Sequence, residues 1–495
     1  MEGIDLNKLL DVLLFHEKDP LLFNSAFFLF FFGVFLLVYT ITYRFNTLRV
    51  YLLTLFSLYF FYKTCGWYVG FILVTAVFDY HIGHTIYRCK KKPLKKFWLV
   101  LSVIVNLGLL VYFKYTNFFI GILNDFAHQE LNPLKLILPI GISFYTFENL
   151  SYTVDVYNGE FKPVTRFIDY LFFLSFFPKL MMGPIVRAAD FIPQINKEPF
   201  VTNKQVGEGL YLITAGIIKK VIISDFINAN YVIHVFENPS VHTGIECLLA
   251  IYGYAMVIYC DFSGYSDMAI GMGKWMGFEI NINFLSPYQS ATVTEFWRRW
   301  HISLSSWLKD YVYIPLGGNR KGKFATYKNL IITMLIGGFW HGASWNFIFW
   351  GALHGIALAV DKLRYKLGRK HLIVLPYSKK ATNILATIIT FHFICLGWIF
   401  FRCDTFNDSW IMLRQIGTNF NINLLKALYT SYSPVIWMIA AAFLLHGISL
   451  NFENKFKHIL VKIPLPLKIL YFIVFIYIAI QCKQADVIKP VYLQF

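Results

Sequence analysis

Charged residues are scarce in this chain of 495 residues, at 15% against ~25% in a typical soluble domain. Hydrophobic residues make up 57% of the chain and aromatic residues 19%, and the mean hydropathy is +0.54. This composition excludes an ordinary cytosolic enzyme, a disordered chain and a collagen-like fibre. It predicts a polytopic integral membrane protein.

Cysteine is sparse and follows no metal-binding or disulfide pattern. The cysteines are odd in number, and no two of them have the C-x-x-C spacing. A disulfide framework and a zinc site therefore lack support, and we expect neither a metal ion nor a bound cofactor. The seven are Cys65, Cys89, Cys247, Cys260, Cys395, Cys403 and Cys482.

Several catalytic motifs are missing as well. No histidine has Asp or Glu five positions later, so the HxxxxD arrangement of glycerolipid acyltransferases is absent. The strings nearest to G-x-S-x-G, at 264–268 and 342–346, lack the final glycine, and neither a P-loop nor HExxH occurs. Serine hydrolysis, ATP hydrolysis and zinc proteolysis all lose support.

Acidic residues are fewer than basic ones, 28 against 45, which gives a formal net charge of +17. The basic residues gather between apolar runs, at 88–96, 298–328, 362–380 and 455–468. That placement is typical of cytoplasmic loops beside an anionic leaflet, and no aromatic-basic RNA-binding signature accompanies it. We therefore expect membrane lipid, and no nucleic acid, as the partner of this charge.

Apolar runs recur along the chain, and about 20 helical residues suffice to cross ~30 Å of hydrocarbon. We predict an all-α polytopic membrane fold with about ten to thirteen transmembrane or re-entrant helices around a central pore. The runs lie at 21–43, 48–63, 66–82, 97–119, 134–157, 168–186, 206–230, 243–272, 328–344, 345–361, 381–401, 433–450 and 466–482.

We expect a single integral membrane domain over 1–495, because no Ser/Gly linker separates a soluble part. It divides into N-terminal helices in 1–130, a catalytic core in 131–361, and C-terminal helices with an outward-facing tail in 362–495. The acidic first twenty residues are unlike a secretory signal. Placing the basic clusters in the cytoplasm puts both termini outside, although the charge pattern between 114 and 240 does not fix the topology.

One of the thirteen histidines stands out by its surroundings. His341 lies in the string Gly-Gly-Phe-Trp-His-Gly-Ala-Ser-Trp-Asn over 337–346, between two apolar runs that form a hairpin. An ionisable group at membrane depth, with glycines that let a ligand approach, indicates a functional site. Trp340 and Asn346 are candidate substrate contacts. The alternative is that His341 only pins the hairpin tip through hydrogen bonds.

A second candidate lies in the segment 295–311, whose apolar side chains form one stripe at helical period. We predict an amphipathic helix in the membrane interface. His301 falls at the border of the two faces, where it points into a cavity or anchors at the headgroups; the pattern favours neither. Arg298 lies on the polar face and is a candidate substrate contact. Arg320, Lys321 and Lys323 follow at a turn, where they could hold a phosphate-bearing donor, with ordinary cytoplasmic charge as the alternative.

Two carboxylates, Asp261 and Asp267, close the apolar run 243–272. Charges at membrane depth are costly unless paired, so we expect them to line a polar cavity, as candidate substrate contacts, or to bond to a neighbouring arginine, without acid-base chemistry. Six other histidines favour plainer roles. We expect helix packing for His354, His392 and His446, and solvent exposure for His16, His371 and His458.

Five strings together resemble the membrane-bound O-acyltransferase superfamily. The similarity points to its bacterial branch of alginate O-acetylation membrane subunits, peptidoglycan O-acetylation proteins and the D-alanyl transfer protein of teichoic acid. The resemblance implies that His341 is the deep catalytic histidine and His301 the second one. It also implies a pore in which a cytoplasmic thioester donor, acetyl-CoA or an acyl carrier protein, meets an acceptor from outside. The strings are 138–147, 183–187, 261–267, 295–320 and 338–342.

From this resemblance we expect an O-acetyltransferase of the bacterial cell membrane that acts on an extracellular or cell-wall polysaccharide, with an exported SGNH-type partner. The alternatives are D-alanyl or other acyl transfer from a carrier protein, and a non-catalytic exporter. The chemistry agrees with an acyltransferase. Moving an acyl group from a thioester to a hydroxyl requires a base that titrates near neutrality, such as histidine, in a site that excludes water.

The sequence ends on a Tyr-x-x-Phe pattern, from Tyr492 to Phe495. It resembles the aromatic C-terminal motif of this branch or of its small partner. That resemblance implies that Tyr492 takes the acyl group before an exported acyltransferase does. An interfacial anchor is the equal alternative.

Overall fold

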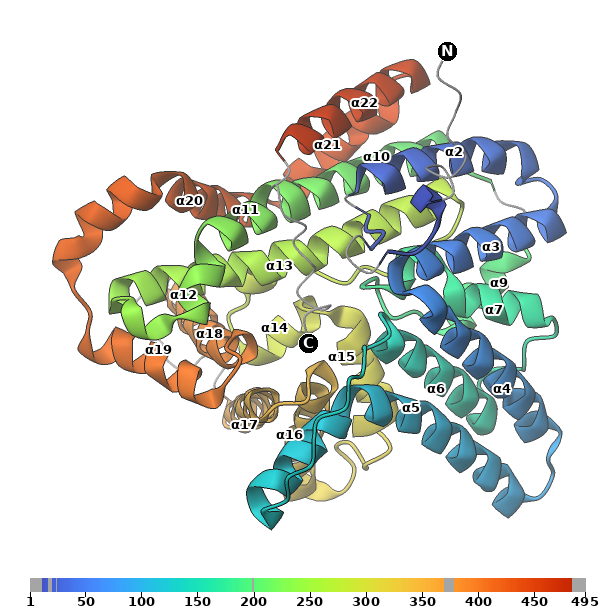
Figure 1. Cartoon of the computed structure of the whole chain (residues 1–495), viewed down its shortest axis with the longest axis horizontal. Coiled ribbons are helices and arrows are strands. Elements are labelled where there is room, and N and C mark those ends of the chain that lie inside the picture. The colour runs from blue at the N-terminus through green and yellow to red at the C-terminus, as the bar shows by residue number, and fades with distance from the viewer. Residues whose placement is uncertain (1–10, 17–19, 24, 198–199, 369–377, 483–495) are drawn as a thin grey trace. The chain divides into compact units, whose positions relative to one another are not determined.

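A computed structural model describes residues 11–16, 20–23, 25–197, 200–368 and 378–482. Within these ranges the protein is helical and contains no β-strand, which confirms the predicted all-α class (Figure 1). The helices form two compact units. Unit 1 comprises 1–213 and 268–281, and unit 2 comprises 214–267 and 282–495.

Unit 1 contains the helices drawn from blue to green in Figure 1, in which α4, α5 and α6 contact one another. Its helices are α2 (Ala26–Thr42), α3 (Asn46–Cys65), α4 (Val69–Arg88), α5 (Lys92–Ala127), α6 (Ile142–Asn158), α7 (Phe167–Ser175), α8 (Phe177–Leu180), α9 (Ala188–Ile195) and most of α10 (Asn203–Ile217).

The interior of unit 1 holds a buried chain of polar side chains from four helices. Asp79 of α4 accepts hydrogen bonds from Ser102 (2.6 Å) and Asn106 (2.7 Å) of α5. Asn106 in turn accepts from Asn149 of α6 (3.1 Å), which accepts from the Tyr170 hydroxyl of α7 (2.7 Å). Because polar groups away from water need partners, this chain of bonds holds the four helices in one register.

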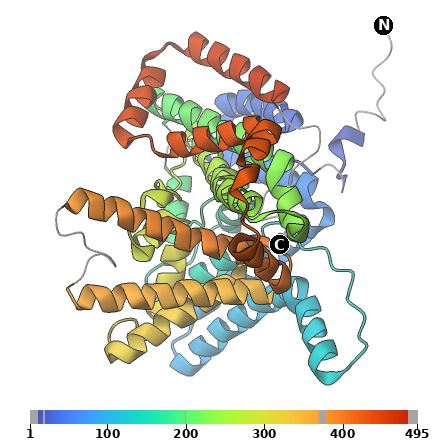
Figure 2. The same cartoon turned by 90° about the vertical axis from the view of Figure 1, so that its left-hand side faces the viewer.

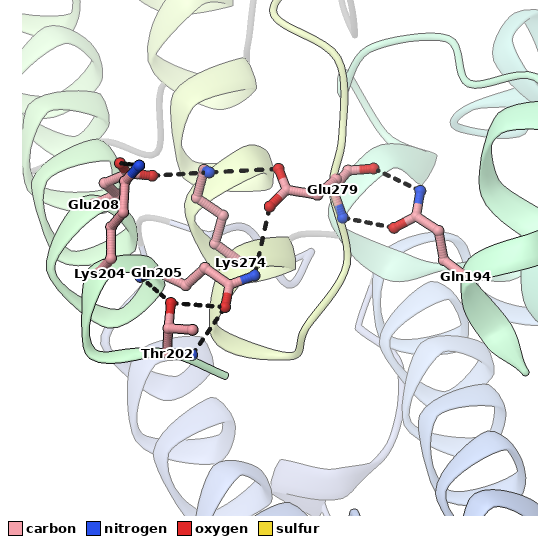
Figure 3. A network of polar contacts seen from close by, with 7 residues as sticks. All are labelled: Gln194, Thr202, Lys204, Gln205, Glu208, Lys274 and Glu279. Atoms are coloured by element: carbon pink, nitrogen blue, oxygen red, sulfur yellow. Dashed lines mark hydrogen bonds and ion pairs between the residues drawn. The ribbon is translucent and has the colours of Figure 1, made fainter. Parts of the chain in front are cut away.

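A second polar network ties the end of α13 (Gly244–Trp275) and the segment after it to α9 and α10 (Figure 3). Lys274 forms ion pairs with Glu208 (3.0 Å) and Glu279 (3.4 Å). The backbone of Glu279 pairs twice with the Gln194 side chain, donating at 2.8 Å and accepting at 3.1 Å. The network fixes the part of unit 1 that contains the end of α13 and the segment after it.

Unit 2 begins with the end of α10 and includes α13 up to Asp267. Its first helix contains two π-helical segments, η2 (Ile218–Ser224) and η3 (Asn228–Val232). The other helices are α11 (Asp225–Ile227), α12 (Ile233–Glu237), α14 (Val293–Arg299), α15 (Ile302–Leu308), α16 (Gly322–His341), α17 (Trp345–Lys366), α18 (Lys379–Arg402), α19 (Phe406–Thr418), α20 (Leu425–His446), α21 (Leu450–Lys462) and α22 (Leu465–Gln481); η6 (Lys309–Tyr313) is a third π segment, and η4 (Pro239–Val241), η5 (Pro287–Gln289) and η7 (Ile422–Leu424) are 3-10 turns.

Every predicted apolar run overlaps a helix, but some runs are broken or shortened. The run at 134–157 becomes helical only at Ile142. Pro139 restricts the residue before it, and Gly141 takes φ +77° where a Cβ would lie 2.5 Å from the Leu180 carbonyl oxygen. The run at 168–186 breaks at Phe176, which has non-helical dihedrals just before Pro178. These two runs are therefore not continuous spans.

By length and composition, five helical stretches among the described residues could cross a membrane. A sixth would be the pair 451–462 and 465–481, bent by 119° at its break. The expected total was larger because it counted shorter, broken or more polar helices as well. The five stretches are 46–88, 92–127, 244–275, 379–402 and 422–446.

Candidate functional site

The helical hairpin of α16 and α17 carries His341 at its tip, and α18 packs against α17 (Figure 2). The two helices of the hairpin approach through glycines. A Cβ on Gly338 would lie 2.2 Å from the Phe347 carbonyl oxygen, and one on Gly351 would lie 2.4 Å from the Met334 carbonyl oxygen. Only glycine permits this backbone contact, so the hairpin geometry, and with it the place of His341, follows from the small residues.

His341 is the last residue of α16 and is 3% exposed. Its ring lies 5.0 Å from the Trp340 ring centroid, 5.1 Å from Trp350 and 5.1 Å from Phe401. The aromatic rings exclude water from the imidazole.

His301 lies at a break between two short helices, which contradicts the single interfacial helix expected over 295–311. α14 ends at Arg299, α15 begins at Ile302, and His301 takes a left-handed conformation with φ +43°. The apolar stripe is buried inside unit 2, and His301 itself is 0% exposed. The headgroup-anchor alternative for His301 is therefore wrong. The helical period continues across the break, which is why the sequence pattern does not reveal it.

Asn283 fixes the proton arrangement of the His301 ring. Its Oδ1 atom accepts from the backbone N–H (3.1 Å) and hydroxyl (2.9 Å) of Ser303, and it lies 3.2 Å from His301 Nδ1. A backbone N–H can only donate, so this Asn283 atom must be the oxygen, and Nδ1 of His301 must carry the proton. The lone pair of the neutral ring is then on Nε2. Burial lowers the pKa of His301 to about 3, so the ring stays neutral.

The two histidines share a neighbour in Trp340. Its ring centroid lies 6.1 Å from that of His301 and 5.0 Å from that of His341. Phe262 contacts the other side of His301 at 4.6 Å. The structure thus brings together two histidines that are 40 positions apart in the sequence, together with the predicted contact Trp340.

A cavity of about 1190 Å³ opens beside this aromatic cluster, within unit 2. Its walls include Trp297, which contacts Trp350 (5.6 Å) and, through it, His341. Four basic side chains line it, and the predicted Arg298 is among them, together with Arg299, Lys309 and Lys362. The predicted Arg320 is not; it is exposed and donates to the Ile314 carbonyl oxygen (3.3 Å).

The predicted carboxylates Asp261 and Asp267 are paired, but with lysines where an arginine was expected. Lys220 forms ion pairs with Asp261 (2.6 Å) and Asp225 (2.7 Å), all nearly fully buried, and Lys219 pairs with Asp267 (2.6 Å). Neither Asp261 nor Asp267 lines the cavity beside the histidines. The signal missed in the sequence is the lysine pair inside the apolar run 206–230, which required buried acidic partners.

Asn346 and His354 do not line the cavity, and each is held by a hydrogen bond to a neighbouring residue. Asn346 Nδ2 donates to the Cys403 carbonyl oxygen (2.7 Å), which joins the start of α17 to the end of α18. The indole N–H of Trp297 donates to His354 Nδ1 (3.2 Å), so the lone pair of that ring is already used. Helix packing was the expected role for His354, and this bond confirms it.

The plainer expectations for the other histidines hold where the structure describes them. His392 bonds to the Tyr252 hydroxyl (2.9 Å), and His446 accepts from the Tyr288 N–H (3.4 Å), which confirms helix packing for both. His16 and His458 are exposed, as expected. His371 and Tyr492 lie outside the described residues. In the described part of the chain, no group of three or more His, Cys, Asp or Glu side chains is placed to hold a metal ion.

Comparison with known families and proteins decides the class of the protein. The model of the MBOAT, membrane-bound O-acyltransferase family matches residues 19–403. The chain belongs to this family. It is therefore a multi-pass membrane O-acyltransferase, and the resemblance described above is confirmed.

Three relatives show where this membrane-bound O-acyltransferase lies within the family. It is 42% identical over 373 residues to the probable alginate O-acetylase AlgI of Pseudomonas aeruginosa, covering 74% of this chain and 69% of that protein. It is 37% identical over 433 residues to the peptidoglycan O-acetyltransferase of Helicobacter pylori, covering 81% and 80%. Similarity to the teichoic acid D-alanyltransferase of Bacillus subtilis is lower, 31% over 288 residues, covering 56% and 71%.

Proposed function

We propose that this O-acyltransferase moves an acetyl group from a cytoplasmic thioester donor to a hydroxyl acceptor, for O-acetylation of an extracellular or cell-wall polysaccharide. The observation that carries the proposal is the pair of buried histidines around Trp340, beside a basic cavity large enough for a cofactor-sized donor. The names of the alginate and peptidoglycan relatives support an acetyl group and a polysaccharide.

The donor is proposed to bind in the 1190 Å³ cavity. Arg298, Arg299, Lys309 and Lys362 would hold its phosphate groups, while Trp297 directs its thioester end toward the histidines. Acetyl-CoA and the phosphopantetheine arm of an acyl carrier protein share this chemistry. The volume of the cavity favours acetyl-CoA, because a nucleotide moiety also needs room.

In the proposed reaction, the acceptor oxygen attacks the thioester carbonyl carbon as His341 takes the hydroxyl proton. A C–O bond forms, the C–S bond breaks, and His341 returns the proton to the leaving thiolate, so no other reactant is consumed. His301 has the wrong tautomer to donate from Nε2 to the oxyanion, and its low pKa makes it a weak base. Its Nε2 lone pair instead suits a hydrogen bond from the acceptor hydroxyl, which orients that oxygen.

The route beyond the membrane is part of the same proposal. With the basic clusters in the cytoplasm of a bacterial cell and both termini outside, the donor enters from within and the acetyl group leaves outward. An exported SGNH-type acetyltransferase is the proposed recipient, and Tyr492 the proposed relay to it. Asp261 and Asp267 support the helices without contacting substrate.

A His341→Ala variant tests the proposal. We expect the protein to insert at wild-type levels and to lose transfer by about 10²- to 10⁴-fold, the contribution of a general base. The measurement is mass analysis of ester-linked acetyl on the surface polysaccharide, with thioester turnover by the purified protein from acetyl-CoA and from an acylated carrier protein. His458→Ala, which removes an exposed histidine, is the control.

Three outcomes would contradict parts of this proposal. Normal acetylation by His341→Ala would remove the proposed base. Turnover of the acylated carrier protein alone would make the donor a carrier, as in the D-alanyl alternative. Turnover of neither donor, with acyl groups still exported by the His341→Ala strain, would favour the exporter.

A further inference from the structure

A second cavity lies in unit 2 between α17 and α18, away from the histidines. Its volume is about 270 Å³. Nearly all of its walls are apolar, and its polar end is formed by Asp361 and Arg364. We call it the α17–α18 groove; its apolar wall residues include Leu353, Ile356, Ala357, Val360, Ile389 and Phe393.

Arg364 brings an unsatisfied donor to this groove. The residue is 7% exposed, and its Nη2 donates to Asp361 Oδ1 (2.8 Å), whereas its buried Nε has no hydrogen-bond partner among the described residues. The other oxygen of Asp361, Oδ2, accepts both the N–H (2.8 Å) and the hydroxyl (3.0 Å) of Thr294. A buried N–H without an acceptor is costly, so an acceptor from another molecule would stabilise the site.

The surroundings of the groove are those of a lipid site. Ile356 and Val360 on its outer wall are 54% and 46% exposed, and α18 is one of the helices able to cross the membrane. The groove is therefore open at the protein surface, beside a helix that is able to cross the membrane. Its polar end is formed near the C-terminus of α17 and the N-terminus of α18, and these helix ends carry Lys366, Lys379 and Lys380. With Arg364 these give four positive charges against the one of Asp361, which favours an anionic headgroup.

We propose that the α17–α18 groove binds an anionic glycerophospholipid. One acyl chain occupies the apolar cavity, an oxygen of the ester or phosphate accepts the Arg364 Nε–H, and the phosphate lies among the lysines. A free phosphate ion would make no favourable contact with the apolar walls. A zwitterionic lipid has no net negative charge, so its electrostatic attraction to the lysines is weaker.

Lipid binding also has a consequence for the reaction. The groove and the large basic cavity share Ala291 and Thr292 in their walls, and Asp361 holds Thr294 at the start of α14, the helix that carries Arg298. A lipid that holds Asp361 and Arg364 in place therefore reduces the mobility of one wall of the basic cavity. We expect a lower KM for the donor with lipid bound. This consequence alone rests on the proposed function, whereas lipid binding does not.

The binding test uses the full chain purified from phosphatidylcholine vesicles containing phosphatidylglycerol, with the retained lipids counted by mass spectrometry. Ala357→Trp fills the groove, and Ile388→Trp, on an exposed face of α18 outside the groove, is the matched control. We expect Ala357→Trp to lower retained phosphatidylglycerol roughly tenfold, because each buried methylene contributes to affinity, and Ile388→Trp to leave it unchanged.

A second arm separates the headgroup from a soluble anion. Arg364→Gln should lower the preference for phosphatidylglycerol over phosphatidylcholine, and inorganic phosphate in the buffer should not displace the lipid. Equal retention by both tryptophan variants, equal retention of the two lipids by the wild-type protein, or displacement by phosphate alone would each overturn the proposal.

Discussion

At the scale of single residues, the two buried histidines around Trp340 differ in what their surroundings allow. His301 is held by Asn283 with its lone pair on Nε2, whereas His341 ends α16 among the rings of Trp340 and Trp350. The two imidazoles therefore differ in the way that the roles proposed for them require. His354 has no proposed role in the reaction, because the Trp297 indole already uses its acceptor nitrogen.

Asn283 is therefore predicted to be a positioning residue for His301. Asn283→Ala frees the ring to rotate or change tautomer, and kcat should fall by about 10- to 100-fold at every pH, as for other partners that orient a functional histidine. Asn283→Asp keeps the acceptor but adds a negative charge, which raises the pKa of His301. Since the neutral ring is the active form, this variant should lose activity as the pH falls and recover it as the pH rises.

The prediction for Asn283 is tested by measuring kcat from pH 5.5 to 9 for the wild type and each variant. The wild-type profile should show no limb from His301, because burial holds its pKa near 3. Ser303→Ala, which keeps the contact between Asn283 and His301, is the control. Identical profiles for the wild type and Asn283→Asp would mean that Asn283 serves only the fold.

At the scale of helices, close packing of the α16–α17 hairpin sets the position of His341. Gly351→Ala would place a methyl group 2.4 Å from the Met334 carbonyl oxygen, a backbone atom that cannot move aside alone. We expect this variant to lose about 1–3 kcal/mol of stability, as overpacked cores do, and to lose transfer activity as His341 shifts.

Gly417→Ala in α19 is the matched control, because a Cβ there meets nothing within 4 Å. It should leave stability unchanged or raise it slightly, by less than about 1 kcal/mol. Thermal unfolding in detergent and acetyl transfer are measured for both variants. If Gly351→Ala matched Gly417→Ala in both assays, the glycine contact would not position the site.

Periodicity in the sequence located the helices well but not the breaks between them. The stripe over 295–311 has the same period in one helix as in two, so the left-handed turn at His301 leaves no trace in the pattern. Pairings between distant segments are hidden for a similar reason. The residues around Asp261 in the sequence do not predict its ion pair with Lys220. Those around His301 do not predict its hydrogen bond with Asn283. The burial of His341 among aromatic rings could be predicted, because the glycines and aromatic residues around it are its neighbours in the sequence.

At the scale of the whole molecule, the distribution of positive charge predicts the orientation on which the proposed chemistry depends. The chain carries +17, and the phosphate groups of a thioester donor are found on the cytoplasmic side of the membrane. The proposed donor site requires that the basic cavity lies on the cytoplasmic side. The same side is expected for the lysines near the α17–α18 groove and for the loops predicted to be cytoplasmic. The direction of acyl transfer therefore depends on the topology.

Labelling of single cysteines checks this orientation. The chain offers a convenient background, because only Cys89 and Cys482 among its seven cysteines are not buried; both are replaced by serine. A membrane-impermeant maleimide added to intact cells should then label Phe420→Cys, between α19 and α20, but not Lys92→Cys or Lys366→Cys. The last two should react only after the membrane is opened, because positive loops stay in the cytoplasm. Labelling of Lys92→Cys in intact cells would reverse the orientation and place the donor cavity on the wrong side for a cytoplasmic thioester.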